Sequence, residues 1–167
     1  MSYLSPAEFV TKMVDTGEAK IHMSTRDTLI RAFMAGAILA LAAVFAVSAS
    51  VMSGSALIGA LLFPVGVCML YLLGFDLLTG VFMLTPLAWL DKRPGASIRG
   101  ILRNWALVFA GNFLGALTVA GMMAFIFTYG FSVPPNEIGQ KIGHIGEART
   151  LGYAQYGLMG WVTIFLR

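Results

Sequence analysis

The chain has 167 residues, of which 58% are hydrophobic and 11% are charged, and its formal net charge is +3. Soluble domains carry about 25% charged residues, so this composition excludes an ordinary water-soluble domain and predicts an integral membrane protein. The basic residues flank apolar segments and do not follow one face, which indicates membrane topology and excludes a nucleic-acid partner.

Residues 1–28 form a polar segment with the pattern of a short amphipathic helix. Ser5 is placed as its N-cap, Pro6 occupies the first helical position and Glu8 is spaced to reach back to the cap. We expect this helix to end near Gly17. It is expected on the cytoplasmic side, either along the membrane surface or against its own bundle.

Residues 29–131 are predicted to form three transmembrane helices. The first runs from about Leu29 to Met52 and the third from about Ile101 to Phe131. Between them the chain is apolar from Ala56 to Leu90, and one straight helix of that length would be roughly 50 Å long. Because a bilayer core is about 30 Å thick, the second helix must tilt strongly or break.

The predicted break lies at residues 74–80, where Gly74 and Gly80 bracket Asp76 in the middle of the apolar run. The first turn of the second half-helix carries a positive dipole end and free N–H groups, which stabilise anions. The Thr79 hydroxyl is placed there to donate to an oxyanion. A charged Asp76 in the pore would repel anions, so we expect it to have a structural role and to cap freed N–H groups.

The third span carries Asn112 between two glycines, Gly111 and Gly115. Small residues allow a neighbouring helix to approach closely, so both glycines are expected at a helix contact. Asn112 is expected to bond across helices and not to touch an ion. Trp89 and Trp105 lie near predicted span ends, and we interpret both as interfacial anchors.

Residues 132–150 are predicted to be an extracytoplasmic loop, and residues 151–167 the start of a fourth transmembrane helix that is truncated. Lys and Arg are concentrated before the first span and between the second and third. The positive-inside rule places both of these regions, and the N-terminus, in the cytoplasm. We therefore expect a multi-pass protein of the cell's inner membrane.

The heptapeptide Gly74-Phe75-Asp76-Leu77-Leu78-Thr79-Gly80 resembles the loop that interrupts the second helix of the formate/nitrite transporter family. Other stretches are also similar to that family: the Ser-Pro-x-Glu start, Phe63 to Val67, Arg103-Asn104-Trp105, and Gly111 to Ala116. The resemblance is good from Ser5 to about Ala120.

This resemblance implies an all-α, aquaporin-like channel fold of six helices in two inverted repeats, assembled as a homopentamer. It implies that each protomer conducts small monovalent anions such as formate or nitrite. The pore-lining positions would be Phe63, Val67, Leu77 and Thr79. The family's central histidine lies on the fifth helix, beyond Arg167, so we expect the 167-residue form alone not to conduct.

Two alternatives remain open. The chain is either a channel or a non-transporting membrane anchor or subunit for a partner enzyme, in which Asp76 and Asn112 only hold helices together. A channel for neutral solutes such as water is disfavoured because no Asn-Pro-Ala tripeptide occurs. Phosphate-binding, metal-binding and nucleophile motifs are also missing, so we predict no enzyme activity, cofactor or metal.

Overall fold

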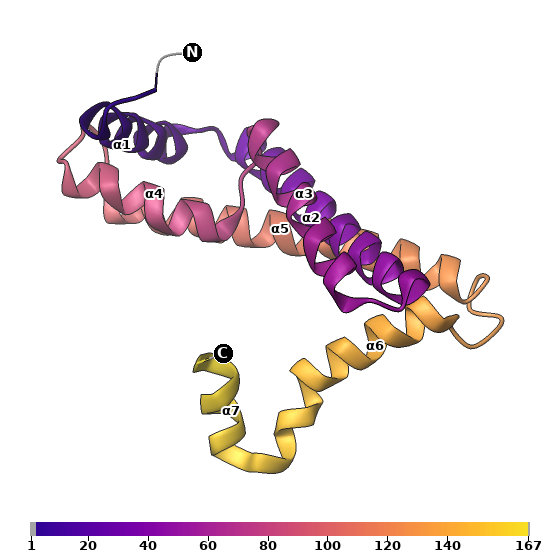
Figure 1. Ribbon diagram of the computed structural model, residues 1–167. Coiled ribbons are helices and arrows are strands. Elements are labelled where there is room, and N and C mark those ends of the chain that lie inside the picture. The colour runs from indigo at the N-terminus through magenta and orange to yellow at the C-terminus, as the bar shows by residue number, and fades with distance from the viewer. Residues whose placement is uncertain (1–2, 167) are drawn as a thin grey trace. The chain divides into compact units, whose positions relative to one another are not determined.

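The computed structural model describes residues 3–166, and its regular structure there is helical throughout (Figure 1). Helices α2 and α5 are long and apolar enough to cross a membrane, and α3 and α4 are shorter apolar helices. The elements are α1 (Pro6–His22), α2 (Thr25–Ser53), α3 (Ala56–Leu72), α4 (Leu78–Leu90), α5 (Ile98–Phe127), α6 (Glu137–Arg149), the 3-10 helix η1 (Leu151–Tyr156) and α7 (Gly157–Leu166).

The chain divides into two compact units. The first unit comprises Met1–Leu41 and Val65–Val119, and the second comprises Ala42–Pro64 and Ala120–Arg167. The predicted break of the second span is therefore contained in the first unit, between α3 and α4.

Helix α1 packs against α4 within the first unit, as expected of a helix that lies against its own bundle (Figure 1). Its capping box is formed as predicted, with the Ser5 and Glu8 side chains each bonded to the other's backbone N–H. The predicted end at Gly17 is wrong, because α1 continues to His22. Gly17 lies at the contact: a Cβ there would be 2.0 Å from the carbonyl oxygen of Leu84.

Helices α2 and α5 meet along a glycine-lined contact in the first unit, as Gly111 and Gly115 predicted. A Cβ on Gly115 would lie 2.0 Å from the Phe33 carbonyl oxygen, and one on Gly111 would lie 2.5 Å from the Ala32 Cβ. Gly36 of α2 has the same close approach to the Asn112 backbone of α5. The two backbones therefore touch without intervening side chains, which strengthens dispersion contacts where water is absent.

Trp105 does not have the surroundings of a simple interfacial anchor. Its indole N–H is shared between the carbonyl oxygen of Val81 (3.2 Å) and the hydroxyl of Thr85 (3.0 Å). Its ring packs edge-on against Phe82 at a centroid distance of 4.7 Å. The polar edge of the indole is thus satisfied by α4, and Trp105 holds α5 to α4.

The second unit differs from the sequence prediction in residues 132–150. We expected a loop between two spans and predicted no helix in it, but Glu137–Arg149 form α6, whose N-cap Asn136 accepts a hydrogen bond from the Gly139 N–H at 3.0 Å. The sequence that follows begins as η1, and α-helix resumes only at Gly157. Also in this unit, Gly59 of α3 lies close to the Ala46 carbonyl of α2.

Candidate functional site: the helix break between α3 and α4

Helix α3 ends in a hydrogen-bonding pattern that requires one residue in the left-handed conformation, which glycine adopts most easily. The Gly74 N–H donates to the Tyr71 carbonyl at 3.1 Å, and the Phe75 N–H donates to the Leu70 carbonyl at 2.9 Å. These two bonds define a Schellman motif, and Gly74 has the left-handed φ of +72° that the motif requires. The glycine therefore stops α3 by its own backbone preference.

Helix α4 begins at Leu78 without a cap from its own N-cap residue, Leu77. The Leu78 N–H instead donates to the side-chain oxygen of Asn112 in α5, at 2.9 Å. The Asn112 amide nitrogen donates to the carbonyl oxygens of Ala32 and Asp76, both at 2.8 Å. One side chain thus joins α2, the break and α4, and the expectation that Asp76 supplies the cap is wrong.

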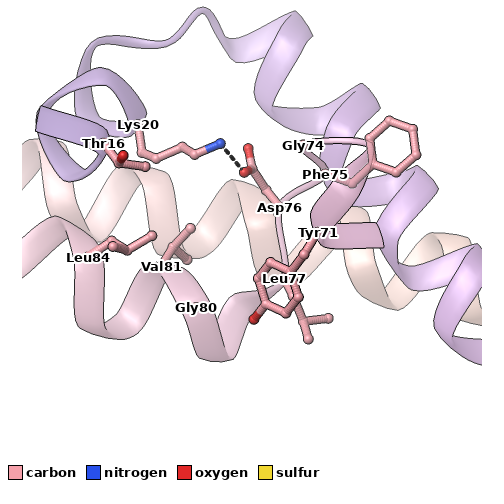
Figure 2. Close-up of a pocket in the computed structure, with 10 residues that line it drawn as sticks. All are labelled: Thr16, Lys20, Tyr71, Gly74, Phe75, Asp76, Leu77, Gly80, Val81 and Leu84. Atoms are coloured by element: carbon pink, nitrogen blue, oxygen red, sulfur yellow. Dashed lines mark hydrogen bonds and ion pairs between the residues drawn. The ribbon is translucent and has the colours of Figure 1, made fainter. Parts of the chain in front are cut away.

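Asp76 is instead paired with a cation. Its Oδ1 accepts a charge-assisted hydrogen bond from Lys20 Nζ of α1 (Figure 2). The Asp76 side chain is 2% exposed and that of Lys20 is 12% exposed, so the pair is largely withdrawn from solvent. Burying a lone charge is expensive, and the ammonium supplies the compensation that the carboxylate needs. The second oxygen, Oδ2, is buried and accepts no hydrogen bond from any residue that the structure describes.

Two further contacts position the cations around the break. The Asn104 side-chain N–H donates to the Lys20 carbonyl at 3.0 Å, which ties the end of α1 to α5. Arg31 of α2 donates to the Gly74 carbonyl at 3.3 Å, and so satisfies an acceptor in the non-helical segment. The Arg31 bond is a case of irregular backbone whose polar group is satisfied by protein and not by solvent.

A cavity of about 170 Å³ adjoins the break (Figure 2). Among the predicted site residues, Gly74, Asp76, Leu77 and Gly80 line it together. Val67 and Thr79 do not line this cavity, and Phe63 belongs to the second unit. The other lining residues are Thr16, Lys20, Tyr71, Phe75, Val81 and Leu84.

Thr79 is exposed in the first turn of α4. Within residues 3–166, neither its hydroxyl nor its backbone N–H has a hydrogen-bond partner, and the Leu77 N–H has none. The start of α4 therefore presents unused donors next to a neutralised Asp76. Such an arrangement suits an anion, because donors and the helix dipole act together.

Sequence reasoning missed the role of Lys20, which it used only for topology. The cause was the misplaced end of α1: a helix that stops at Gly17 does not include Lys20. In the observed helix, Lys20 lies three residues after Gly17 and therefore on the same buried side. The continuation of the apolar spacing to Ile21, which is 6% exposed, was the available signal.

Comparison with known families identifies the family of the chain. Residues 7–167 match the profile of a family described as "Formate/nitrite transporter". That match includes nearly all of α1, both sides of the break and all of α5.

Individual relatives of the chain are also named as transporters or channels. The chain is 31% identical over 173 residues to a "Probable formate transporter" of Methanothermobacter thermautotrophicus, covering 97% of this chain and 60% of the relative. It is 32% identical to a "Formate channel FocA" of Haemophilus influenzae, covering 73% of this chain and 44% of the relative. It is 31% identical to an "Uncharacterized transporter YrhG" of Bacillus subtilis, over 72% of this chain and 47% of the relative. The chain thus spans 60% or less of the length of each.

Proposed function

Because the chain belongs to the formate/nitrite transporter family, we propose that it forms part of a pore for small monovalent anions, such as formate or nitrite, across the cytoplasmic membrane. The relatives named as formate transporters or channels support the choice of a weak-acid anion. The apolar helices and the family together identify a membrane protein.

The observation that carries this proposal is the unused donor set at the start of α4. Thr79 offers a hydroxyl and an N–H, and Leu77 offers a second N–H, at the point where a long apolar helix is interrupted. An ion that enters a low-dielectric region loses its water and needs such donors in exchange. Thr79 would contact the anion directly.

The Lys20–Asp76 pair supports the same proposal. An unpaired carboxylate at the break would repel an approaching anion by several kcal/mol in a medium of low effective dielectric constant. Pairing with Lys20 removes most of that repulsion, while Asn112 takes over the capping of α4. Gly74, Asp76 and Gly80 would then shape the break, and Gly111, Asn112 and Gly115 would hold it against α2 and α5.

The proposed assembly is an aquaporin-like, inverted-repeat channel that forms homopentamers, with Phe63, Val67 and Leu77 as apolar pore-lining residues. The proposed topology places the N-terminus in the cytoplasm. In the first unit the basic residues support this orientation, because Arg103 at the start of α5 bonds to Thr25 at the start of α2, so both helices begin at the same side.

Anion flux in proteoliposomes tests the proposal. Thr79→Val should lower formate and nitrite flux roughly 5-fold, since a hydrogen bond of about 1 kcal/mol is lost. Thr79→Ser should retain most of the flux. Thr118→Val is the matched control, because the exposed Thr118 hydroxyl already bonds to its own helix at Leu114.

Unchanged flux in Thr79→Val, with the protein still assembled, would refute the contact between Thr79 and the anion. A protein that carries no flux, and loses a co-purifying enzyme when Asn112 is replaced, would instead be a membrane anchor.

A further inference from the structure

A cavity of about 300 Å³ lies between α2 and α5 in the first unit, and it takes no part in the helix break. Its wall presents only apolar surface. At Gly111 the two helices approach closely, because a Cβ there would lie 2.5 Å from the Ala32 Cβ of α2. The residues that line it are Leu29, Ile30, Phe33, Met34, Gly111 and Leu114.

Two arginines stand at one end of this groove. Arg26 lies four residues before Ile30 in α2 and so on the same face of that helix. Arg103 lies two helical turns before Gly111 in α5 and donates to the Thr25 hydroxyl at 2.6 Å. That bond places the N-terminal ends of α2 and α5 together, and hence both cations at the same end of the groove.

The Arg26 side chain is exposed, and its guanidinium has no hydrogen bond or ion pair within residues 3–166. Its neighbour Asp27 already accepts the Ser24 hydroxyl at 2.7 Å, as part of the cap of α2. Arg103 is half-buried and held in place by Thr25 and the Met23 carbonyl. The apolar groove therefore has two guanidinium groups at one end, that of Arg103, which is held in place, and that of Arg26, which is unpaired within residues 3–166.

We propose that this groove binds one anionic phospholipid, with an acyl chain along the apolar wall and the phosphate on Arg26 and Arg103. Guanidinium groups bind phosphate oxygens in pairs, which gives such contacts both strength and direction. Basic pockets between transmembrane helices are recognised sites for anionic lipid headgroups. Phospholipid is available to the groove because the bilayer surrounds the protein.

A second copy of the chain that presents this same face suits the groove less well, and a contact with a different face of a second copy is an outcome of the test below. Two copies in one membrane have the same orientation, so a contact between identical faces brings Arg26 of each copy to the same depth. Those like charges repel, and Asp27, already engaged by Ser24, offers little compensation. A lipid phosphate supplies the opposite charge that the surface lacks.

The test is lipid-dependent stability of the detergent-purified chain, together with native mass spectrometry to count bound lipids. Adding phosphatidylglycerol should raise the Tm more than adding phosphatidylcholine, and one phosphatidylglycerol should remain bound per chain. Arg26→Gln should weaken phosphatidylglycerol binding roughly 5-fold, because each arginine near a phosphate contributes about that factor. Arg26 is the preferred target because its loss breaks no contact among the described residues.

Two controls separate the groove from general effects. Arg149→Gln removes the same charge from α6 in the second unit and should leave phosphatidylglycerol binding unchanged. Met34→Trp should fill the groove and weaken binding of both lipids, whereas Met122→Trp, an equally apolar change on an exposed part of α5, should not.

Equal stabilisation by the two lipids, or an unchanged phosphatidylglycerol response in Arg26→Gln, would overturn the proposal. A change in oligomeric state on Met34→Trp, with lipid binding unaltered, would also overturn it and assign the groove to a second copy.

Discussion

In the first unit, polar side chains join residues that are far apart in the sequence, whereas several in the second unit bond to their own helix. Lys20 reaches Asp76, and Asn112 reaches both Ala32 and Leu78. In the second unit the hydroxyls of Ser48, Ser53, Thr128 and Thr163 donate to carbonyl oxygens four residues earlier.

Both solutions satisfy polar groups that a membrane cannot hydrate, but they have different consequences. A hydroxyl bonded to its own helix is satisfied wherever that helix lies. A side chain that bonds to a distant helix is satisfied only when the two helices are packed, so it fixes their relative position. The break at residues 73–77 depends on the second kind of bond, and the first unit should therefore be far less tolerant of polar substitution.

The largest expected effect is at the buried ion pair. Lys20→Met leaves the Asp76 carboxylate buried without a cation and should lower the free energy of unfolding by about 3–5 kcal/mol. Thermal unfolding in detergent measures this. Replacing both partners, as Lys20→Met with Asp76→Leu, should recover most of the loss, since no unpaired charge remains. A single and a double variant of equal stability would argue against the pairing.

Asn112→Ala should have the second largest effect. It should lower the free energy of unfolding by about 3 kcal/mol, because three hydrogen bonds worth about 1 kcal/mol each disappear. The matched variant in the second unit is Asn136→Ala, which removes the local cap of α6 and should cost about 1 kcal/mol. The same unfolding assay compares them. Equal losses would show that the distant cap contributes no more than the local one.

Glycine replacement should have the next largest effect on stability, with opposite signs in the two units. Gly17→Ala places a methyl group 2.0 Å from the Leu84 carbonyl oxygen and should cost about 2 kcal/mol. Gly121→Ala, in the part of α5 that belongs to the second unit, meets no atom within 4 Å and should stabilise α5 by about 0.5–1 kcal/mol. Shifts in Tm of opposite sign are the expected result, and shifts of the same sign would contradict it.

The smallest effect should appear at the N-terminus of α1, outside the spans. Hydrogen bonds from the Ser5 side chain and backbone lower the pKa of Glu8 below its ordinary value. The capping box therefore contributes its full stability above the unfolded-state pKa of about 4.3, and this is lost as the pH falls through the lowered pKa of Glu8. NMR titration should show the lowered pKa of Glu8, and Ser5→Ala should reduce the shift, because only the hydrogen bond from the Ser5 backbone N–H remains.

Local patterns in the sequence determined the start of α1, the end of α3 and the class of the protein. Composition identified a membrane protein, Ser5 and Glu8 predicted the start of α1, and Gly74 predicted the interruption of the second span. These features depend on backbone preferences and on side chains within a few residues, so a single sequence contains them. The heptapeptide that starts at Gly74 also indicated the family, because its residues are contiguous in the chain.

Tertiary structure decided which side chains complete the site. Lys20 and Asp76 are 56 residues apart, and Asn112 and Leu78 are 34 apart, and no local pattern pairs them. The same holds for Trp105, whose N–H is satisfied by α4 and which the sequence placed at the membrane interface. Close glycine contacts bring α1 to α4 and α2 to α5, and the depth and rotation at which helices pack are set by all of their side chains at once.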